Sequence, residues 1–103
     1  MAIQNTQIHS TPTQIFLAVN QQAITTIIAC NVSQQTSYLS LFAVPYGKNP
    51  GVSTQILSEV ELPAGESFAL DSERFVLENN DAIYAQSSVD NAITITISSV
   101  STA

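Results

Sequence analysis

The C-terminal part of the chain alternates between apolar and polar residues. From Ile93 to Ser98, isoleucine occupies every second position, and the positions between hold Thr or Ser. Neighbouring side chains of a β-strand point to opposite faces of the sheet, so this alternation predicts a strand with one apolar and one polar face. The strand is expected to span Ala92 to Val100, with its isoleucines in the core.

Two segments nearer the N-terminus carry apolar residues on both faces. Tyr38–Val44 is apolar at nearly every position, and Ala23–Val32 has apolar side chains in both strand phases. A strand of this kind is central in its sheet or is covered by a partner on its second face. In the second segment, one phase holds Ile24, Ile28, Cys30 and Val32, and the opposite phase holds Ile27 and Ala29.

Turn residues separate these segments at short intervals. A loop is predicted at Gly47–Gly51, which contains two Gly and a Pro, and a tight turn at Pro63–Gly65. Two further turns are predicted where the residues tolerate a left-handed backbone, at Asn79–Asp81 and Asp90–Asn91. About seven to eight short strands with a turn every 8–12 residues or so predict an all-β chain, an antiparallel β-sandwich of immunoglobulin-like or jelly-roll-like type. The remaining strands are predicted at Gln14–Val19, Thr54–Leu62, Glu66–Leu70, Arg74–Leu77 and Ala82–Ser88.

The chain of 103 residues has the size of one domain. We predict the sandwich over residues 14–103. Residues 1–13 fit neither the strand nor the helix period, and Pro12 would interrupt a central strand. They are therefore expected to form an N-terminal arm, which either packs on a neighbouring molecule or frays as chain ends commonly do.

Charged residues are few and confined to the second half. No Asp, Glu, Lys or Arg precedes Lys48, and charged residues make up 10% of the chain, against about a quarter in an average soluble protein. The core of a protein interface is depleted of charge. The neutral half, with its strands from Gln14 to Val44, therefore predicts a surface covered by other protein. The candidate contact residues in its two apolar strands are Ile24, Ile27, Tyr38, Leu39 and Leu41.

The same charge count excludes several partners. The net charge is −6 and the only cations are Lys48 and Arg74, whereas binding to nucleic acid or to an anionic membrane requires several Lys or Arg. No apolar run approaches the roughly 18 residues that span a bilayer, and Met1–Asn5 lacks the features of a secretory signal. We expect a soluble chain made in the cytoplasm.

Candidate chemistry is sparse. His9 is the single histidine, and Cys30 is a lone cysteine in an apolar context, expected to be a small buried side chain. Glu59 and Glu61 are spaced to share one strand face, which favours a solvated edge over a calcium site. Asn31-Val32-Ser33 matches a glycosylation sequon by chance. The sequence predicts no catalytic set, no metal site and no cofactor, and therefore a protein that is not an enzyme.

The order of these signals resembles small β-sandwich structural proteins of tailed bacteriophage particles. In those chains an early strand ends in Asn-x-Ser, as at Asn31–Ser33, and a second runs into a Pro-x-Gly loop, as at Pro45–Gly47. A leucine-proline-small-glycine-glutamate turn follows, as at Leu62–Glu66. A Gly-Asp or Asn-Asp turn then precedes an Ile-x-Ala strand, as at Asn80–Ala85. The resemblance implies a non-catalytic virion component present in many copies.

The expected function is that of a virion structural protein, most simply a capsid decoration (cement) protein acting through symmetric contacts. Its expected partners are copies of itself, for example in a trimer, and other virion proteins such as the major capsid protein. A tail, neck or baseplate component is an alternative of the same class. A carbohydrate-binding adhesin or fibre module, using Tyr46 and the loop Gly47–Val52, is an alternative of another class.

Overall fold

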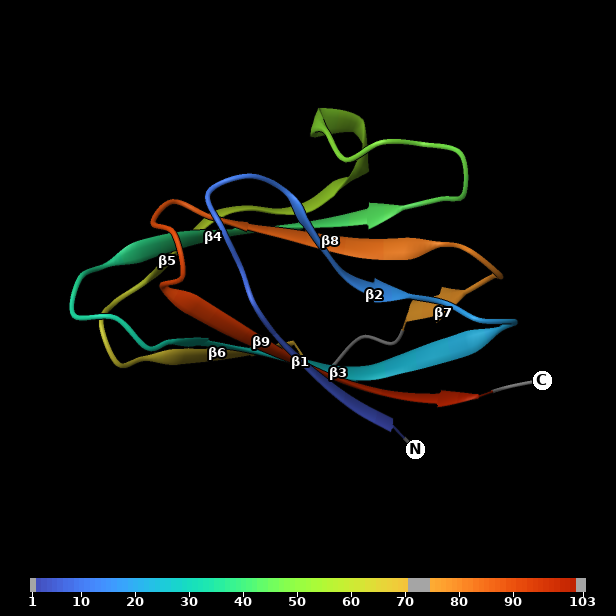
Figure 1. Cartoon of the computed structure of the whole chain (residues 1–103), viewed down its shortest axis with the longest axis horizontal. Helices are drawn as coiled ribbons and strands as arrows, with labels where there is room; N and C mark the ends of the chain where they lie inside the picture. Colours follow the sequence, from blue (N-terminus) through green and yellow to red (C-terminus); the bar gives the residue numbers. More distant parts are fainter. Residues whose placement is uncertain (1, 71–74, 102–103) are drawn as a thin grey trace.

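The chain folds into two antiparallel β-sheets that pack face to face (Figure 1). The computed structural model describes residues 2–70 and 75–101, and these contain nine strands, so the predicted β-sandwich is confirmed. The first sheet, sheet A, consists of β1 (Ala2–Gln7), β9 (Ile93–Ser101), β3 (Gln22–Asn31), β6 (Ser67–Leu70) and β7 (Phe75–Leu77). The second, sheet B, consists of β2 (Thr13–Leu17), β8 (Ala82–Ser87), β4 (Ser37–Val44) and β5 (Gln55–Leu62).

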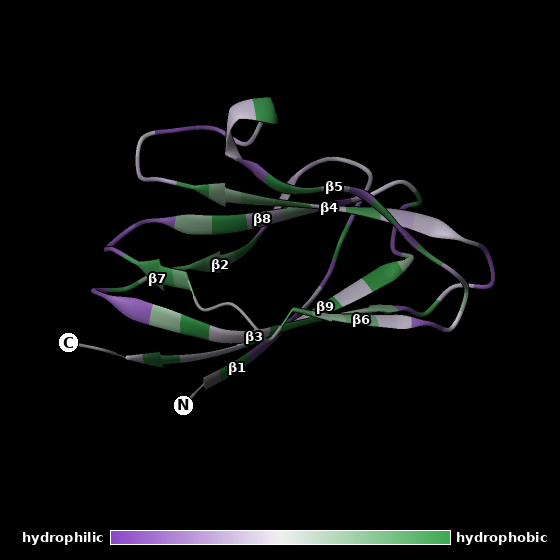
Figure 2. Ribbon diagram, turned by 180° about the vertical axis from the view of Figure 1, so that it is seen from behind, coloured by the Kyte–Doolittle hydropathy of each residue, from purple (hydrophilic) through white to green (hydrophobic). Residues whose placement is uncertain are grey.

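The core lies between the two sheets. Ile93, Ile95 and Ile97 of β9 are at most 1% exposed, while the Thr and Ser residues between them are half-buried on the outer face up to Ser98. The alternation is visible along β9 in Figure 2 as green and white bands. The predicted phase of this strand is therefore confirmed. Opposite β9, the core is completed by Leu39, Leu41, Ile83 and Ala85 of sheet B.

Strand β4 is central in sheet B, between β8 and β5. Leu39 and Leu41 point into the core, whereas Phe42 and Val44 lie outside the core cluster and are still only 5% and 4% exposed. The loop after β4 contains a short 3₁₀ helix, η1 (Val52–Thr54), that contacts β4 and stands on the outer side of sheet B in Figure 1. The second apolar face of β4 is thus covered within the chain at Phe42 and Val44.

Strand β3 contains a β-bulge that reverses its phase. The register against β9 shifts between Ile24 and Thr26, so both Ile24 and Ile27 face the core. The prediction that Ile24 shares a face with Ile28, Cys30 and Val32 was therefore wrong. Because one extra residue moves every later side chain to the opposite face, Ile28 and Val32 point outward and are 40% and 57% exposed.

The N-terminal segment belongs to both sheets. Residues Ala2–Gln7, expected as part of an arm, form edge strand β1 on β9 of the same chain, and the next strand already begins at Thr13. Ile8, fully buried, marks the crossing from sheet A to sheet B, which Figure 1 shows in blue. The segment is thus paired within the chain, and a contact with a neighbour remains a prediction.

The turn predictions agree with the backbone. Gly65, Asn80 and Asn91 have φ values of 78°, 72° and 61°, in the left-handed region that Gly and Asn tolerate. The Glu66 amide donates to the Pro63 carbonyl at 3.0 Å and closes the predicted turn. Arg74, the predicted start of β7, lies outside the described residues.

Candidate functional site

Four of the five predicted contact residues are core residues. Ile24, Ile27, Leu39 and Leu41 are at most 2% exposed, because each faces the opposite sheet of its own sandwich. They cannot touch a neighbour while the chain is folded, so their assignment to an interface is corrected. Tyr38 differs, since it lies on the outer face of sheet B and is 43% exposed.

The neutral half of the sequence does not form one half of the molecule. Strand β3 pairs with β9, β6 and β7 from the second half, and β4 pairs with β5 and β8. Charge is nevertheless segregated in the structure. Glu59 and Glu61 of β5 are the only charged residues in the strands that the structure describes, and the other described charges lie in loops and turns.

All described strand residues of sheet A are consequently uncharged, including those on the outer face of the sheet. The exposed apolar side chains Ile3, Ile28 and Val76 alternate there with hydroxyl and amide side chains. On this face the Thr96 hydroxyl donates to Asn5 Oδ1 at 2.7 Å, linking β9 to β1. The outward residues of the five strands, assigned from register and burial, are Ile3, Asn5, Gln7, Ala23, Thr26, Ile28, Cys30, Ser67, Ala69, Val76, Thr94, Thr96, Ser98 and Val100.

Cys30 belongs to this outer face. It pairs in register with Thr94 on one side and Ser67 on the other, and it is half-buried rather than buried as predicted. The bulge in β3 explains the difference, because it turns the phase of Cys30 away from the core. A single thiol is therefore placed within the uncharged surface.

Asn31 of the sequon is fully buried at the end of β3. Its Nδ2 donates to the carbonyls of Gln35 and Leu62, both at 2.8 Å. Its Oδ1 accepts from the Ser33 amide at 2.9 Å and from the Ser33 hydroxyl at 2.7 Å. The amide therefore joins the β3–β4 connection to the end of β5, which is a structural role.

The acidic turns also hold the fold together. The two carboxylate oxygens of Asp81 accept backbone N–H groups from Tyr46 and Glu78, and Asn79 accepts from Asn20. Asp90 accepts the Ser10 amide at 2.6 Å, and hydrogen bonds from Ser10 hold the pKa of this carboxyl below its ordinary value. Within the described ranges, no three His, Cys, Asp or Glu side chains gather closely enough to hold a metal ion.

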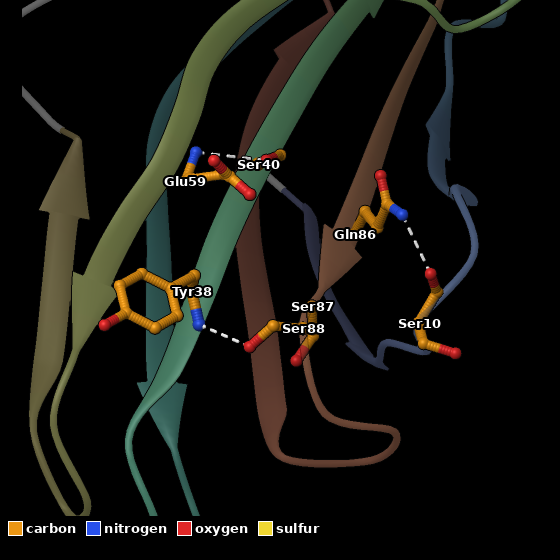
Figure 3. A pocket seen from close by; sticks show the side chains of 7 residues that line it. All are labelled: Ser10, Tyr38, Ser40, Glu59, Gln86, Ser87 and Ser88. Carbon is orange, nitrogen blue, oxygen red and sulfur yellow. Dashed lines mark hydrogen bonds between the residues drawn. The ribbon is translucent and has the colours of Figure 1, made fainter.

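A polar hollow of about 280 Å³ opens on the outer face of sheet B (Figure 3). Its sides come from β4, β5 and β8 and from the segment between β1 and β2. The Tyr38 amide donates to Ser88 Oγ at 2.9 Å, and Gln86 Nε2 donates to the Ser10 carbonyl at 2.8 Å. The hollow is lined by Ser10, Tyr38, Ser40, Glu59, Gln86, Ser87 and Ser88.

Glu59 enters this hollow from a bulge. In the pairing of β5 with β4, Val60 lies opposite Leu39, and Leu57 lies opposite Leu41. Between these pairs, the two residues Ser58 and Glu59 face a single residue of β4, and this extra residue makes the bulge. Glu59 has a φ of 48°, and its amide donates to Ser40 Oγ at 3.1 Å. Sequence reasoning placed Glu59 and Glu61 on a plain strand face and missed the hollow, because no residue in the sequence signals this bulge.

The side chains of the other candidate residues are not among those that line the hollow. Tyr46 is 73% exposed in the loop after β4, as predicted, and its backbone is tied to Asp81. His9 is exposed, and its carbonyl accepts the Ser87 amide at 2.9 Å.

No protein-family model, curated protein or solved structure matches this chain. In the described part of the chain, no helix is long and apolar enough to cross a membrane. The functional argument therefore rests on the two surfaces: the uncharged outer face of sheet A and the polar hollow of sheet B.

Proposed function

We propose that this chain is a non-enzymatic structural protein of a tailed bacteriophage virion, most simply a capsid decoration protein. It acts through symmetric contacts with copies of itself and through contacts with the major capsid protein. A tail, neck or baseplate position would use the same kind of contact. The observation that supports this proposal is the uncharged outer face of sheet A.

The physical argument concerns the cost of desolvation. Burying an unpaired charge in an interface costs several kcal/mol, so surfaces that associate carry few charges at their centre. Sheet A offers five strands without a charged residue among those described, although the chain as a whole carries −6. Its Thr, Ser, Asn and Gln side chains can exchange hydrogen bonds across a contact, while Ile3, Ile28 and Val76 supply apolar area.

The assembly is tested by the solution mass, measured by light scattering across a dilution series. We expect a closed oligomer of the 11.0 kDa chain, and dissociation to monomers when Thr96 at the centre of sheet A is replaced by Lys. Glu61→Lys on the opposite sheet is the matched control and should leave the mass unchanged. A wild-type monomer at every concentration, or equal effects of both variants, contradicts this contact surface.

The virion role needs a separate test. Purified protein, labelled with a fluorophore, is mixed with heads and with tails of the phage that encodes it and then sedimented. Saturable binding to heads supports decoration, and binding to tails alone supports the tail, neck or baseplate alternative. Binding to neither particle contradicts a virion function.

A carbohydrate-binding adhesin or fibre module is the second candidate. It is favoured by the high exposure of Tyr46 beside the loop Gly47–Val52. Glycan-array binding that is lost in Tyr46→Ala supports this candidate, and retention of binding in that variant excludes this loop as the site.

A further inference from the structure

We propose that the polar hollow on sheet B binds a single neutral sugar unit. This site is distinct from the loop around Tyr46, and it lies on the sheet opposite the proposed contact face. It can therefore operate in an assembled protein, and it does not depend on the virion role. Its volume of about 280 Å³ is at the lower end of the range for small-molecule sites, which suits one monosaccharide unit.

The hollow offers hydrogen-bonding groups in fixed positions. The amide of Gln86 is oriented by its bond to the Ser10 carbonyl, so its Oε1 is the end left to accept. The Glu59 backbone is held by Ser40, and within the described residues the Glu59 carboxylate makes no hydrogen bond. A carboxylate and an amide oxygen together can accept from neighbouring hydroxyl groups, and neighbouring hydroxyls are the common feature of sugars.

Tyr38 adds an apolar surface to these acceptors. Its side chain is 43% exposed at the rim of the hollow, and in Figure 3 its ring extends from β4 to the side away from Gln86 and Ser88. Tyrosine combines an apolar ring with a hydroxyl that bonds to solvent or ligand. The C–H groups of a pyranose ring can pack on such a ring while the sugar hydroxyls bond to Glu59 and Gln86.

The charge of the hollow selects against other ligands. Among the residues that the structure describes, no Lys or Arg lines it, and the Glu59 carboxylate repels phosphates and acidic sugars. A calcium ion takes about 6–8 oxygen ligands, usually with several carboxylates, whereas one carboxylate lines this hollow. A neutral polyhydroxylated ligand fits this lining, because it brings hydroxyl donors to the two acceptors and carries no negative charge.

The backbone conformation at Glu59 is the kind found at binding sites. A φ of 48° is unfavourable for a residue with a Cβ, and β-bulges of this kind redirect side chains next to binding sites. Here the bulge places Glu59 beside Tyr38 and Ser40 in the hollow.

The experiment is an NMR titration of the ¹⁵N-labelled full chain with methyl glycosides of glucose, galactose, mannose and N-acetylglucosamine. For an open site of this kind we expect a Kd on the order of 1 mM, so that about 10 mM glycoside gives near saturation. At least one glycoside should shift the amide signals of Tyr38, Glu59 and Gln86. Glu59→Gln should weaken binding about tenfold, since a hydrogen bond to a charged acceptor is replaced by a neutral one.

Glu61→Gln is the matched control, because it makes the same change of charge on the same strand outside the lining of the hollow, and it should leave the affinity unchanged. The spectrum of each variant shows directly whether it is folded. The proposal is overturned if no neutral glycoside shifts these signals, if Glu59→Gln binds like the wild type, or if Tyr46→Ala alone abolishes binding. It is also overturned if N-acetylneuraminic acid, an acidic sugar, binds as tightly as the neutral glycosides.

Discussion

Replacing Asn31 with alanine should destabilise the fold by several kcal/mol, although Asn31 lies outside the apolar core. The substitution removes two donors and two acceptor contacts at once. Its main consequence is at the carbonyl of Leu62, a residue only 3% exposed, which loses the side chain that pairs with it. An unsatisfied buried carbonyl costs about 1–3 kcal/mol, and each other lost hydrogen bond adds about 0.5–1 kcal/mol.

Water can reach part of the remaining network, because Ser33 is half-buried and Gln35 is exposed. We therefore expect a total loss of about 3 kcal/mol in the free energy of unfolding, out of about 5–15 kcal/mol for a typical domain. Ser33→Ala is the matched control. It removes the hydroxyl contact to Asn31 and two solvent-exposed contacts to the backbone of Gln35, while the Ser33 amide still donates to Asn31, so its cost should be about 1 kcal/mol.

Urea denaturation followed by circular dichroism measures both variants. With a slope of about 1.5 kcal/mol per molar urea, Asn31→Ala should lower the midpoint by about 2 M and Ser33→Ala by well under 1 M. Isosteric Asn31→Asp should be at least as destabilising as alanine, because its oxygens face two carbonyls. A loss below about 0.5 kcal/mol for Asn31→Ala, or equal losses for the alanine variants, would refute the role of this residue.

Three further predictions concern single side chains. Leu41→Lys should lower the free energy of unfolding by about 4 kcal/mol or more, because residue 41 is fully buried. Glu61→Lys on the edge strand should change the free energy of unfolding by less than about 0.5 kcal/mol. Thermal unfolding measures both variants. Glu59→Gly should raise the unfolding free energy by about 0.5–1 kcal/mol, because glycine accepts a φ of 48°, and a loss in urea denaturation would contradict strain at this bulge. Hydrogen bonds from Ser10 lower the pKa of Asp90 in the folded state, so the stability they contribute is present above the unfolded pKa of about 3.9 and is lost as the pH falls through the lower folded pKa. Asp90→Asn should therefore flatten the acid limb of denaturation below about pH 4.

Most of the fold could be predicted from the sequence because local signals agree with the tertiary structure. The alternation from Ile93 to Ser98 specifies a half-buried strand in any context. Gly65, Asn80 and Asn91 tolerate the backbone that their turns require. The N-terminal strand was missed because β1 is a polar edge strand, held by its pairing with β9 more than by apolar contacts.

The surfaces could not be predicted, since burial in the core and burial by a partner produce the same apolar pattern. Leu39 and Leu41 were assigned to a contact for this reason, and the structure places them between its own sheets. Two bulges, at Thr25 and at Ser58–Glu59, change which residues face outward. Each depends on pairing with a distant strand, which the local sequence does not specify.

The outer face of sheet A should become covered when the protein associates. The reactivity of Cys30 measures this covering directly. Cys30 is the only cysteine of the chain, and it lies half-buried on that face beside Thr94. The measurement is the rate at which a bulky maleimide modifies Cys30, followed by mass spectrometry over a dilution series of the full chain. We expect the rate to fall as protein concentration rises and to recover in Thr96→Lys. A rate independent of concentration, in a sample that light scattering shows to be oligomeric, would contradict it.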